Sequence, residues 1–482
     1  MSIATEMPRP PFAKGRTMES VIALFAVAAA ALVVVEPGGM MLVLFVLLAA
    51  MAAIHFDLFL CAMVFLLPWH PFINWKLPLR DALLPAHLLL FAGVWVLQVK
   101  RGILLQDWVW RGWARKGMLV FTALAVFSLL VSELHATLGP YKAVAKLLSY
   151  VAMFLSVAAW AHTRQRIETI VKLLLASTIG VALFGFYQAF SDGFTPLYFR
   201  IYPFEEDIFD STGGWTGRIT SFLFHFNSLA GYLNAVIPFA LGVAVLGKRR
   251  PLRWLGFICL AASLAALYLT SSRGGLVACG AVALLALCCL APRRTTALVL
   301  VAAVLVATLI AWPLTSKESV HAARLKGVDD FTRDSRVALW GAAAVIFLEH
   351  PIVGAGFGTY RFSFHRFIPG IRDDLDAHNL YLQTLAETGV IGFLIFFASV
   401  AVFIRIAVRL LRGTDPLMRI VGSGAGGAIA ATLVHGMVDY IFIASPQFGN
   451  LFWLVLGLAL ASAELSEQGG RVTRVIPATA GW

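Results

Sequence analysis

Hydrophobic positions along the chain form long uninterrupted runs, and polar positions gather in the segments between them. Each run is about 20 residues long, which is the length that an α-helix needs to cross the hydrocarbon core of a bilayer. Strands of a membrane barrel are only about half as long, so the run length excludes a barrel. The pattern predicts an all-α, polytopic transmembrane helical bundle of about 12–14 spans. The spans are expected near residues 19–35, 40–55, 57–68 (short enough to be re-entrant), 83–98, 117–133, 142–161, 167–190, 219–246, 252–271, 274–291, 296–313, 382–404, 420–441 and 449–465.

Composition supports the same class of protein. Hydrophobic residues make up 60% of the chain, charged residues make up 13%, and the mean hydropathy is +0.83. A soluble domain with a solvated surface cannot have this composition. The five cysteines lie inside apolar runs, where free cysteine packs as a small hydrophobic residue, so we expect neither a disulfide nor a metal site from them.

The net charge of +12 predicts how the chain is oriented in the membrane. With the amino terminus inside, most of the 38 Lys and Arg residues fall in loops on the cytoplasmic side, in keeping with the positive-inside rule. Many of the others lie in one long outer loop, 314–381, where the rule has little force. The positive charge is therefore a topology signal and does not indicate a nucleic-acid partner. The first apolar run is expected to act as an uncleaved anchor.

This orientation divides the chain into three parts. A cytoplasmic segment, 1–18, precedes the transmembrane bundle, 19–465, and a cytoplasmic tail, 466–482, follows it. The tail contains Gly, Gln and Pro and has no apolar period, so we expect it to be disordered. Two outer loops, 191–217 and 314–381, are the places where chemistry is expected, because the second is too long to be a simple connection.

The second outer loop is predicted to hold helices near 317–326 and 334–349, followed by a glycine-rich turn at 354–358. The turn reads Gly-Ala-Gly-Phe-Gly, which is superficially like a phosphate-binding loop. No strand pattern precedes it and no Gly-Lys-Ser or Gly-Lys-Thr follows it, so the context of a nucleotide site is missing. We interpret the segment as a helix stop after Pro351 followed by a tight turn.

Two arginines at the predicted outer face indicate an anion site. Arg218 opens one apolar span, and Arg273 separates two others. A guanidinium group inside a bilayer costs about 2.5–3.5 kcal/mol on insertion scales, so its presence needs a reason. Guanidinium groups bind phosphate oxygens through planar, paired hydrogen bonds, which suits a diphosphate near lipid headgroups. The alternative is that both side chains only extend to the membrane interface.

The segment from Asp376 to Gly389 places a histidine at the membrane surface. The pKa of imidazole suits removal of a proton from a hydroxyl group near neutral pH, so His378 is the candidate general base. Asp376 can fix its tautomer, and Asn379 can cap the helix that follows. Glu387 is a weaker candidate, which can equally satisfy a neighbouring backbone or basic group. The alternative for His378 is a hydrogen-bonded structural histidine.

Taken in order, these residues resemble the O-antigen ligase and polymerase superfamily over about residues 200–465. The resemblance rests on Arg218 with Phe226-Asn227-Ser228-Leu229-Ala230, on Ser271-Ser272-Arg273-Gly274, on Arg336-x3-Trp340 with His350-Pro351-x2-Gly354-x-Gly356, and on Ala377-His378-Asn379-x-Tyr381-Leu382 with Glu387-x-Gly389. The closing pattern of the family is matched by His435, Asp439 and Ser445-Pro446-Gln447. The chain departs from the family at Phe226, where proline is usual.

The resemblance implies a glycosyltransferase of the bacterial inner membrane whose active site faces the periplasm. Such an enzyme takes a glycan from an undecaprenyl diphosphate carrier among the membrane lipids and joins it to a glycan or lipid A-core acceptor. It uses no cofactor, no nucleotide sugar and no metal ion. The resemblance places Arg218 and Arg273 on the diphosphate and His378 at the acceptor hydroxyl, with Arg336 as a secondary candidate. The implied chemistry is a single displacement that inverts the anomeric configuration.

The sequence leaves three functions open. A ligase joins a preassembled polysaccharide to a lipid A-core acceptor, and a polymerase extends a repeat-unit glycan of O-antigen, capsule or exopolysaccharide. Both would use the same donor site, so family motifs do not separate them. A transporter or flippase of lipid-linked sugar belongs to a different class and would need charged residues along the spans. Here almost all charged residues lie at span ends or in loops, which favours a one-sided outer site.

Overall fold

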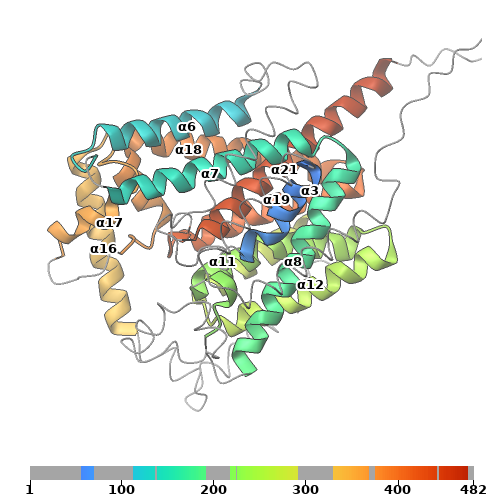
Figure 1. Cartoon of the computed structure of the whole chain (residues 1–482), viewed down its shortest axis with the longest axis horizontal. Helices are drawn as coiled ribbons and strands as arrows, with labels where there is room; N and C mark the ends of the chain where they lie inside the picture. The colour runs from blue at the N-terminus through green and yellow to red at the C-terminus, as the bar shows by residue number, and fades with distance from the viewer. Residues whose placement is uncertain are drawn as a thin grey trace, which may run out of the picture.

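The computed structural model describes residues 56–69, 112–135, 138–190, 218–223, 225–290, 329–368, 375–441 and 445–475, and every regular element within them is a helix (Figure 1). Eight of these helices are long and apolar enough to cross a membrane. They are α6 (Trp113–Leu130), α7 (Leu138–Trp160), α8 (Arg164–Phe190), α11 (Phe226–Leu246), α12 (Arg250–Leu269), α18 (Leu380–Arg412), α19 (Pro416–His435) and α21 (Pro446–Val475). The chain is an all-α, multi-pass membrane protein, which confirms the predicted fold class.

Two shorter apolar helices accompany these eight. α3 (Phe56–Leu66) corresponds to the predicted third span and is short, as expected. α13 (Arg273–Leu290) corresponds to the span predicted near 274–291. Outside the described residues lie the spans predicted near 19–35, 40–55, 83–98 and 296–313, the outer loop 191–217 and the helix predicted near 317–326.

The span predicted from residue 219 begins as a helix only at Phe226. Residues 218–220 have no regular structure, and Ser221–Leu223 form a 3-10 turn, η2. His225 then caps α11, because its side chain accepts a hydrogen bond from the backbone N–H of Asn227 at 3.2 Å. The membrane-spanning helix therefore begins at Phe226, and the residues before it form a 3-10 turn and an N-cap.

The span predicted to end near residue 441 ends earlier. α19 stops at His435, and residues 436–440 lie outside any long helix. The N–H of Gly436 closes the last turn by donating to the carbonyl of Thr432 at 2.8 Å. Residues 436–440 therefore lie outside α19, and they contribute to the candidate site.

α21 is longer than predicted. It continues to Val475, so the first part of the carboxyl tail is helical, and the prediction of disorder there is wrong. Glu464 accepts two hydrogen bonds from the buried Arg115 of α6, at 2.7 and 2.9 Å. Glu467 forms an ion pair with Arg409 of α18. These contacts hold the helix beyond its apolar part, and composition alone does not reveal them.

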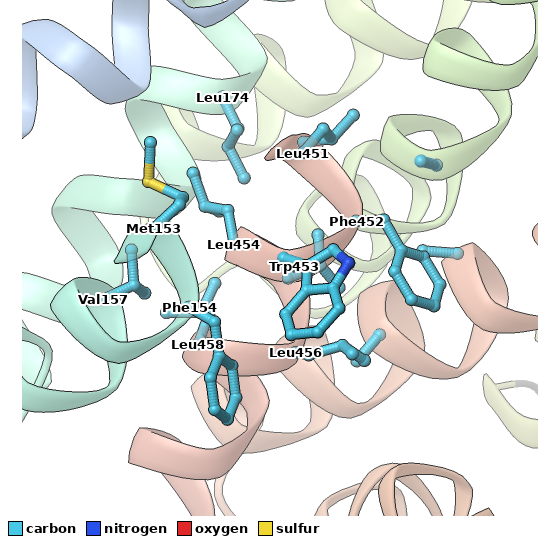
Figure 2. Packing of buried hydrophobic residues seen from close by; sticks show 14 of the residues in the cluster. Met153, Phe154, Val157, Leu174, Leu451, Phe452, Trp453, Leu454, Leu456 and Leu458 are labelled. Atoms are coloured by element: carbon cyan, nitrogen blue, oxygen red, sulfur yellow. The ribbon is translucent and has the colours of Figure 1, made fainter. Parts of the chain in front are cut away.

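The most buried of the long helices is α21, which packs along α7. Figure 2 shows side chains of α7 beside those of α21, among them Met153, Phe154, Val157, Leu454 and Leu458. The rings of Phe154 and Trp453 meet edge to face, with their centroids 6.1 Å apart. A Cβ at Gly457 would lie 2.6 Å from the carbonyl oxygen of Phe154, so glycine is what lets the two backbones approach.

The two ends of the bundle carry different features. At one end, ion pairs join neighbouring helices: Arg115–Glu464, Arg164–Asp415, Arg166–Asp57 and Arg409–Glu467. At the other end lie α16 (Asp329–Glu349), α17 (Tyr360–Ser363) and the short helix η3 (Phe364–Arg366). Figure 1 shows α16 crossing this end beside α17, while the last part of α21 projects at the opposite end. α16 confirms the helix predicted near 334–349.

A small second core joins α16 and α17 to the start of α18. It consists of Leu339, Ala342, Ala343, Ile346, Tyr360, Phe364, Ala377 and Ala386. The glycine-rich turn packs against the same part of α18, where the N–H of Ala355 donates to the carbonyl of Ala386 at 2.8 Å. Gly354 has φ +77°, and a Cβ there would lie 2.3 Å from the backbone of Glu387. The interpretation of this segment as a tight turn is therefore confirmed.

Candidate active site

Several helix ends meet at the end of the bundle that α16 crosses. The N–H of Leu380, at the start of α18, donates to the carbonyl of Gly436, just after α19, at 2.7 Å. The N–H of Ile219, before α11, donates to the carbonyl of Leu269, the last residue of α12, at 3.3 Å. Segments that lie far apart in the sequence are thus side by side here, and they carry most of the predicted site residues.

His378 and Asp439 form the central pair of this cluster. Nδ1 of His378 lies 3.1 Å from Oδ1 of Asp439. The same carboxylate accepts hydrogen bonds from the backbone N–H of Tyr440, at 2.7 Å, and from the side-chain amide of Asn227. Because a carboxylate only accepts, Nδ1 carries the proton of the neutral imidazole, and Nε2 is the basic nitrogen. The histidine side chain is 28% exposed and the aspartate side chain 7%, so the pair is open on the side of the base.

Nearby imidazole groups control the charge of Asp439. Burial alone would raise its pKa, but the hydrogen bond with His378 and the electrostatic effects of His378, His435 and His225 outweigh burial. The pKa of Asp439 is held well below its usual range. Asp439 is therefore ionised at neutral pH and can stabilise a positive charge on His378.

Asp376 is not the carboxylate partner of His378, so that prediction is wrong. Both carboxylate oxygens of Asp376 bind the guanidinium group of Arg361, and Oδ1 also accepts a hydrogen bond from Nε2 of Gln383 at 3.1 Å. A guanidinium group offers two parallel hydrogen bonds and a full charge, which a neutral imidazole cannot match. Asp439, which lies 61 residues from His378 in the sequence, takes the predicted place of Asp376.

Asn379 caps α18, as predicted. Its Oδ1 accepts hydrogen bonds from the backbone N–H groups of Tyr381 and Leu382, both at 3.0 Å. Its Nδ2 donates to the carbonyl of Met437 at 3.1 Å. The cap therefore also ties the residue next to His378 to the chain that follows α19.

Glu387 lies deeper in α18 and is buried. Its Oε1 accepts hydrogen bonds from Nε2 of Gln383, at 3.1 Å, and from the backbone N–H of Tyr360, at 3.3 Å. These contacts match the second of the two roles considered for it, satisfaction of neighbouring polar groups.

Arg218 and Arg336 both lie close to His225. The guanidinium group of Arg218 sits over the ring of Phe226, 4.4 Å from its centroid. Burial is the main cause that lowers the pKa of His225 to about 4; Asp439 opposes this shift, and both guanidinium groups add to it. The structure therefore brings Arg218, from the segment before α11, and Arg336, from α16, to the same half-buried imidazole.

Arg273 is the first residue of α13 and is exposed. A Cβ at the next residue, Gly274, would lie 3.0 Å from Cδ2 of His435, so the start of α13 touches the end of α19. On the other side of Arg273, the hydroxyl of Ser272 donates to Oδ1 of Asn227 at 2.7 Å. The backbone of Arg273 is thus anchored to the residues around the central carboxylate.

His225 and the role of Asp439 are what sequence reasoning missed. Asp439 was matched only to the closing pattern of the family, with no link to His378. His225 stands directly before the helix start at Phe226-Asn227. This position could have indicated His225 from the sequence. The side chain of an N-cap residue lies at the helix N-terminus, where anionic ligands are commonly bound.

The arrangement fits transfer of a group between a hydroxyl and a phosphate. A basic imidazole held by a carboxylate can remove a proton from a hydroxyl group. Guanidinium groups at the same helix ends can stabilise negative charge on a departing phosphate. Among the described residues, no group of three or more His, Cys, Asp or Glu side chains is arranged to hold a metal ion.

Part of the chain matches a known protein family. Residues 258–397 match a family model described as O-antigen ligase, which confirms the resemblance found from the motifs. The matched range runs from within α12 to within α18 and includes Arg273, Arg336 and His378. Arg218 and Asp439 lie outside it. No curated protein matches the chain.

Proposed function

We propose that the protein is a membrane glycosyltransferase of the ligase type, from the premise that residues 258–397 match a family model described as O-antigen ligase. It would move a glycan from undecaprenyl diphosphate to an acceptor hydroxyl, on lipid A-core or a similar acceptor, at the periplasmic face of the inner membrane. The observation that carries the proposal is the His378–Asp439 pair, which lies among helix ends that also carry Arg218 and Arg273.

In the proposed reaction, His378 is the general base. Its Nε2 takes the proton of the acceptor hydroxyl while the hydroxyl oxygen attacks the anomeric carbon of the glycan. The imidazolium ion that results is stabilised by Asp439, which is hydrogen-bonded to Nδ1 at 3.1 Å. General base catalysis of this kind contributes about 10²- to 10⁴-fold to a rate.

The arginines act on the donor. As the new bond forms, the bond between the anomeric carbon and the diphosphate oxygen breaks, and undecaprenyl diphosphate leaves with the electron pair. Arg218, Arg273 and Arg336 would stabilise the added negative charge, because guanidinium groups remain charged and bind phosphate oxygens in pairs. Attack from the side opposite the leaving group inverts the anomeric configuration. This scheme uses only side chains of the protein.

The charges at the two ends of the bundle support a periplasmic site. The basic segment 405–419 belongs to the end that is opposite α16, and basic loops favour the cytoplasm. We therefore place the segments 1–18 and 466–482 in the cytoplasm. The outer loops 191–217 and 314–381 are accordingly assigned to the periplasmic side.

The test uses the full-length protein in nanodiscs with an undecaprenyl diphosphate-linked glycan and two acceptors, lipid A-core and the free glycan repeat. Products are separated on a gel and identified by mass. Transfer to lipid A-core is the expected result. Extension of the glycan repeat in its place would identify a polymerase with the same donor site. If the protein binds the donor but forms no product with either acceptor, the result would contradict the proposed transferase function and favour a transporter of lipid-linked sugar.

A further inference from the structure

Three residues other than glycine have a positive φ in the described part of the chain, and each is a candidate site residue or lies within three residues of one. They are Ser221 (φ +50°), Ser271 (φ +51°) and His378 (φ +47°). Ser221 lies three residues after Arg218, and Ser271 two residues before Arg273. A side-chain-bearing residue in this conformation costs about 1–3 kcal/mol and persists only where its surroundings hold it. Each segment therefore needs side chains that fix it.

Gln383, at the start of α18, holds the segment of His378. Its Oε1 accepts a hydrogen bond from the backbone N–H of Ala377 at 2.9 Å. Its Nε2 donates to Oδ1 of Asp376 and to Oε1 of Glu387, both at 3.1 Å. A backbone N–H only donates, so the orientation of the amide is determined by its partners. Only 1% of Gln383 is exposed, and its amide fixes the peptide group between Asp376 and Ala377, one residue before His378.

Gln188, near the end of α8, holds the segment of Arg218 in the same way. Its Oε1 accepts hydrogen bonds from the backbone N–H groups of Ser221, at 2.7 Å, and of Thr220, at 3.3 Å. The hydroxyl of Ser221 also donates to the carbonyl of Val181 at 2.7 Å. Gln188 is only 4% exposed. The strained segment that follows Arg218 is thus fastened to α8 at two points.

We propose that Gln188 and Gln383 are positioning residues that act on separate halves of the transfer reaction. Gln188 acts through Arg218 on binding of the lipid-linked diphosphate, and Gln383 acts through His378 on deprotonation of the acceptor hydroxyl. This inference rests on the proposed function. The division follows from the contacts, because the two amides belong to different helices and hold different segments of the chain.

Methionine is the matched substitution at both positions, because it has a similar length and makes no comparable hydrogen bond. Gln188→Met is expected to weaken donor binding about tenfold, the usual effect of one or two lost hydrogen bonds. Gln383→Met is expected to leave donor binding unchanged and to lower kcat at saturating donor by about 10- to 100-fold, because small displacements of a catalytic group are costly. Donor affinity without acceptor and initial transfer rates are measured in nanodiscs.

Gln165→Met is the control for both variants. Gln165 is exposed and lies at the start of α8, the same helix that carries Gln188, at the end of the bundle opposite the site. Donor affinity and kcat of this variant are expected to equal those of the wild type. Thermal unfolding of all variants in detergent checks that each is folded.

The variant Gln383→Glu distinguishes a positioning role of Gln383 from a general effect of substitution on folding. The glutamate keeps the oxygen that accepts from Ala377 and, while protonated, still donates to one carboxylate. Once ionised, it stands beside carboxylates and is repelled. Position 383 contacts Asp376 and Glu387 directly. Arg361 binds Asp376, and the phenols of Tyr360 and Tyr440 interact electrostatically with both carboxylates. The ratio of its kcat to the wild-type kcat is therefore expected to fall as the pH rises.

Two results would overturn this inference. One is that both methionine variants lose donor affinity and kcat in the same proportion. The other is that the kcat ratio of Gln383→Glu does not change with pH. A wild type that binds donor but transfers no glycan to any acceptor would instead contradict the proposed function, and the donor-binding measurement on Gln188→Met remains informative in that case.

Discussion

At the scale of single residues, the contact between His378 and Asp439 gives an ordinary imidazole a defined tautomer and a basic nitrogen. The sequence predicted His378 from its residue type and its place at a membrane surface. It could not predict the partner, because Asp439 comes to His378 only through the packing of α18 against α19. Asp376 is nearer in the sequence, but Arg361 binds it more strongly.

Replacing Asp439 with asparagine tests the central pair. Asp439→Asn removes the negative charge that stabilises the imidazolium ion, so single-turnover transfer is expected to fall about 10²- to 10⁴-fold. Donor binding should remain near that of the wild type. Asp415→Asn, at the cap of α19 on the opposite end of the bundle, is the control and should transfer at the wild-type rate. Wild-type transfer by Asp439→Asn would remove the carboxylate from the mechanism.

The pH dependence of stability depends on His225. Its pKa in the folded protein is about 4, below the ordinary value of 6.5. Between these values the unfolded state binds more protons, so stability is full above pH 6.5 and falls as the pH falls toward 4. The loss should reach about 2 kcal/mol by about pH 5. His225→Asn keeps a capping side chain but does not titrate, and its thermal unfolding should lose this part of the pH dependence. Identical profiles for both proteins would contradict the assignment.

At the scale of helices, hydrophobic runs predicted which segments are helical but misplaced some of their ends. The segment 219–225 reads Ile-Thr-Ser-Phe-Leu-Phe-His and contains no Gly, Pro or charged residue, so its pattern continues that of α11. The structure breaks the helix before His225, because Gln188 binds the backbone of residues 220 and 221 and a cap forms at His225. Hydrogen bonds from a distant helix leave no mark on local hydropathy.

The glycine-rich turn gives a prediction at this scale. Gly354→Ala should destabilise the protein by about 1–3 kcal/mol, because φ is +77° and a Cβ would meet the backbone of Glu387. Gly341→Ala is the matched control, since no atom lies within 4 Å of a Cβ there and the residue is inside α16. It should stabilise the protein by about 0.5–1 kcal/mol. Unfolding midpoints that shift in the same direction would contradict this account of the turn.

At the scale of the whole molecule, composition and run length were sufficient to predict a multi-pass helical bundle. They also predicted that the chemistry lies at one end, because charged residues avoid the apolar runs. They did not predict that the site draws on segments as distant as Arg218 and Asp439, because that depends on which helix ends meet. The resemblance over about residues 200–465 includes both Arg218 and Asp439, whereas the family model matches only residues 258–397 and omits both.

Labelling from outside the cell tests the orientation of the molecule. His365→Cys, in η3, and Gly413→Cys, just after α18, place thiols at opposite ends of the bundle. The described native cysteines, Cys61, Cys259 and Cys279, lie in apolar helices and should give little background. A membrane-impermeant maleimide should label position 365 in intact spheroplasts and position 413 only after the membrane is opened. The reverse pattern would place the site in the cytoplasm.

The central claim is that His378 activates the acceptor while other residues bind the donor. The most direct measurement is single-turnover glycan transfer by His378→Ala in nanodiscs, with donor binding measured on the same sample. We predict wild-type donor affinity and a rate about 10²- to 10⁴-fold lower. His162→Ala, an exposed histidine between α7 and α8, should behave as the wild type. Transfer by His378→Ala at the wild-type rate would contradict the account.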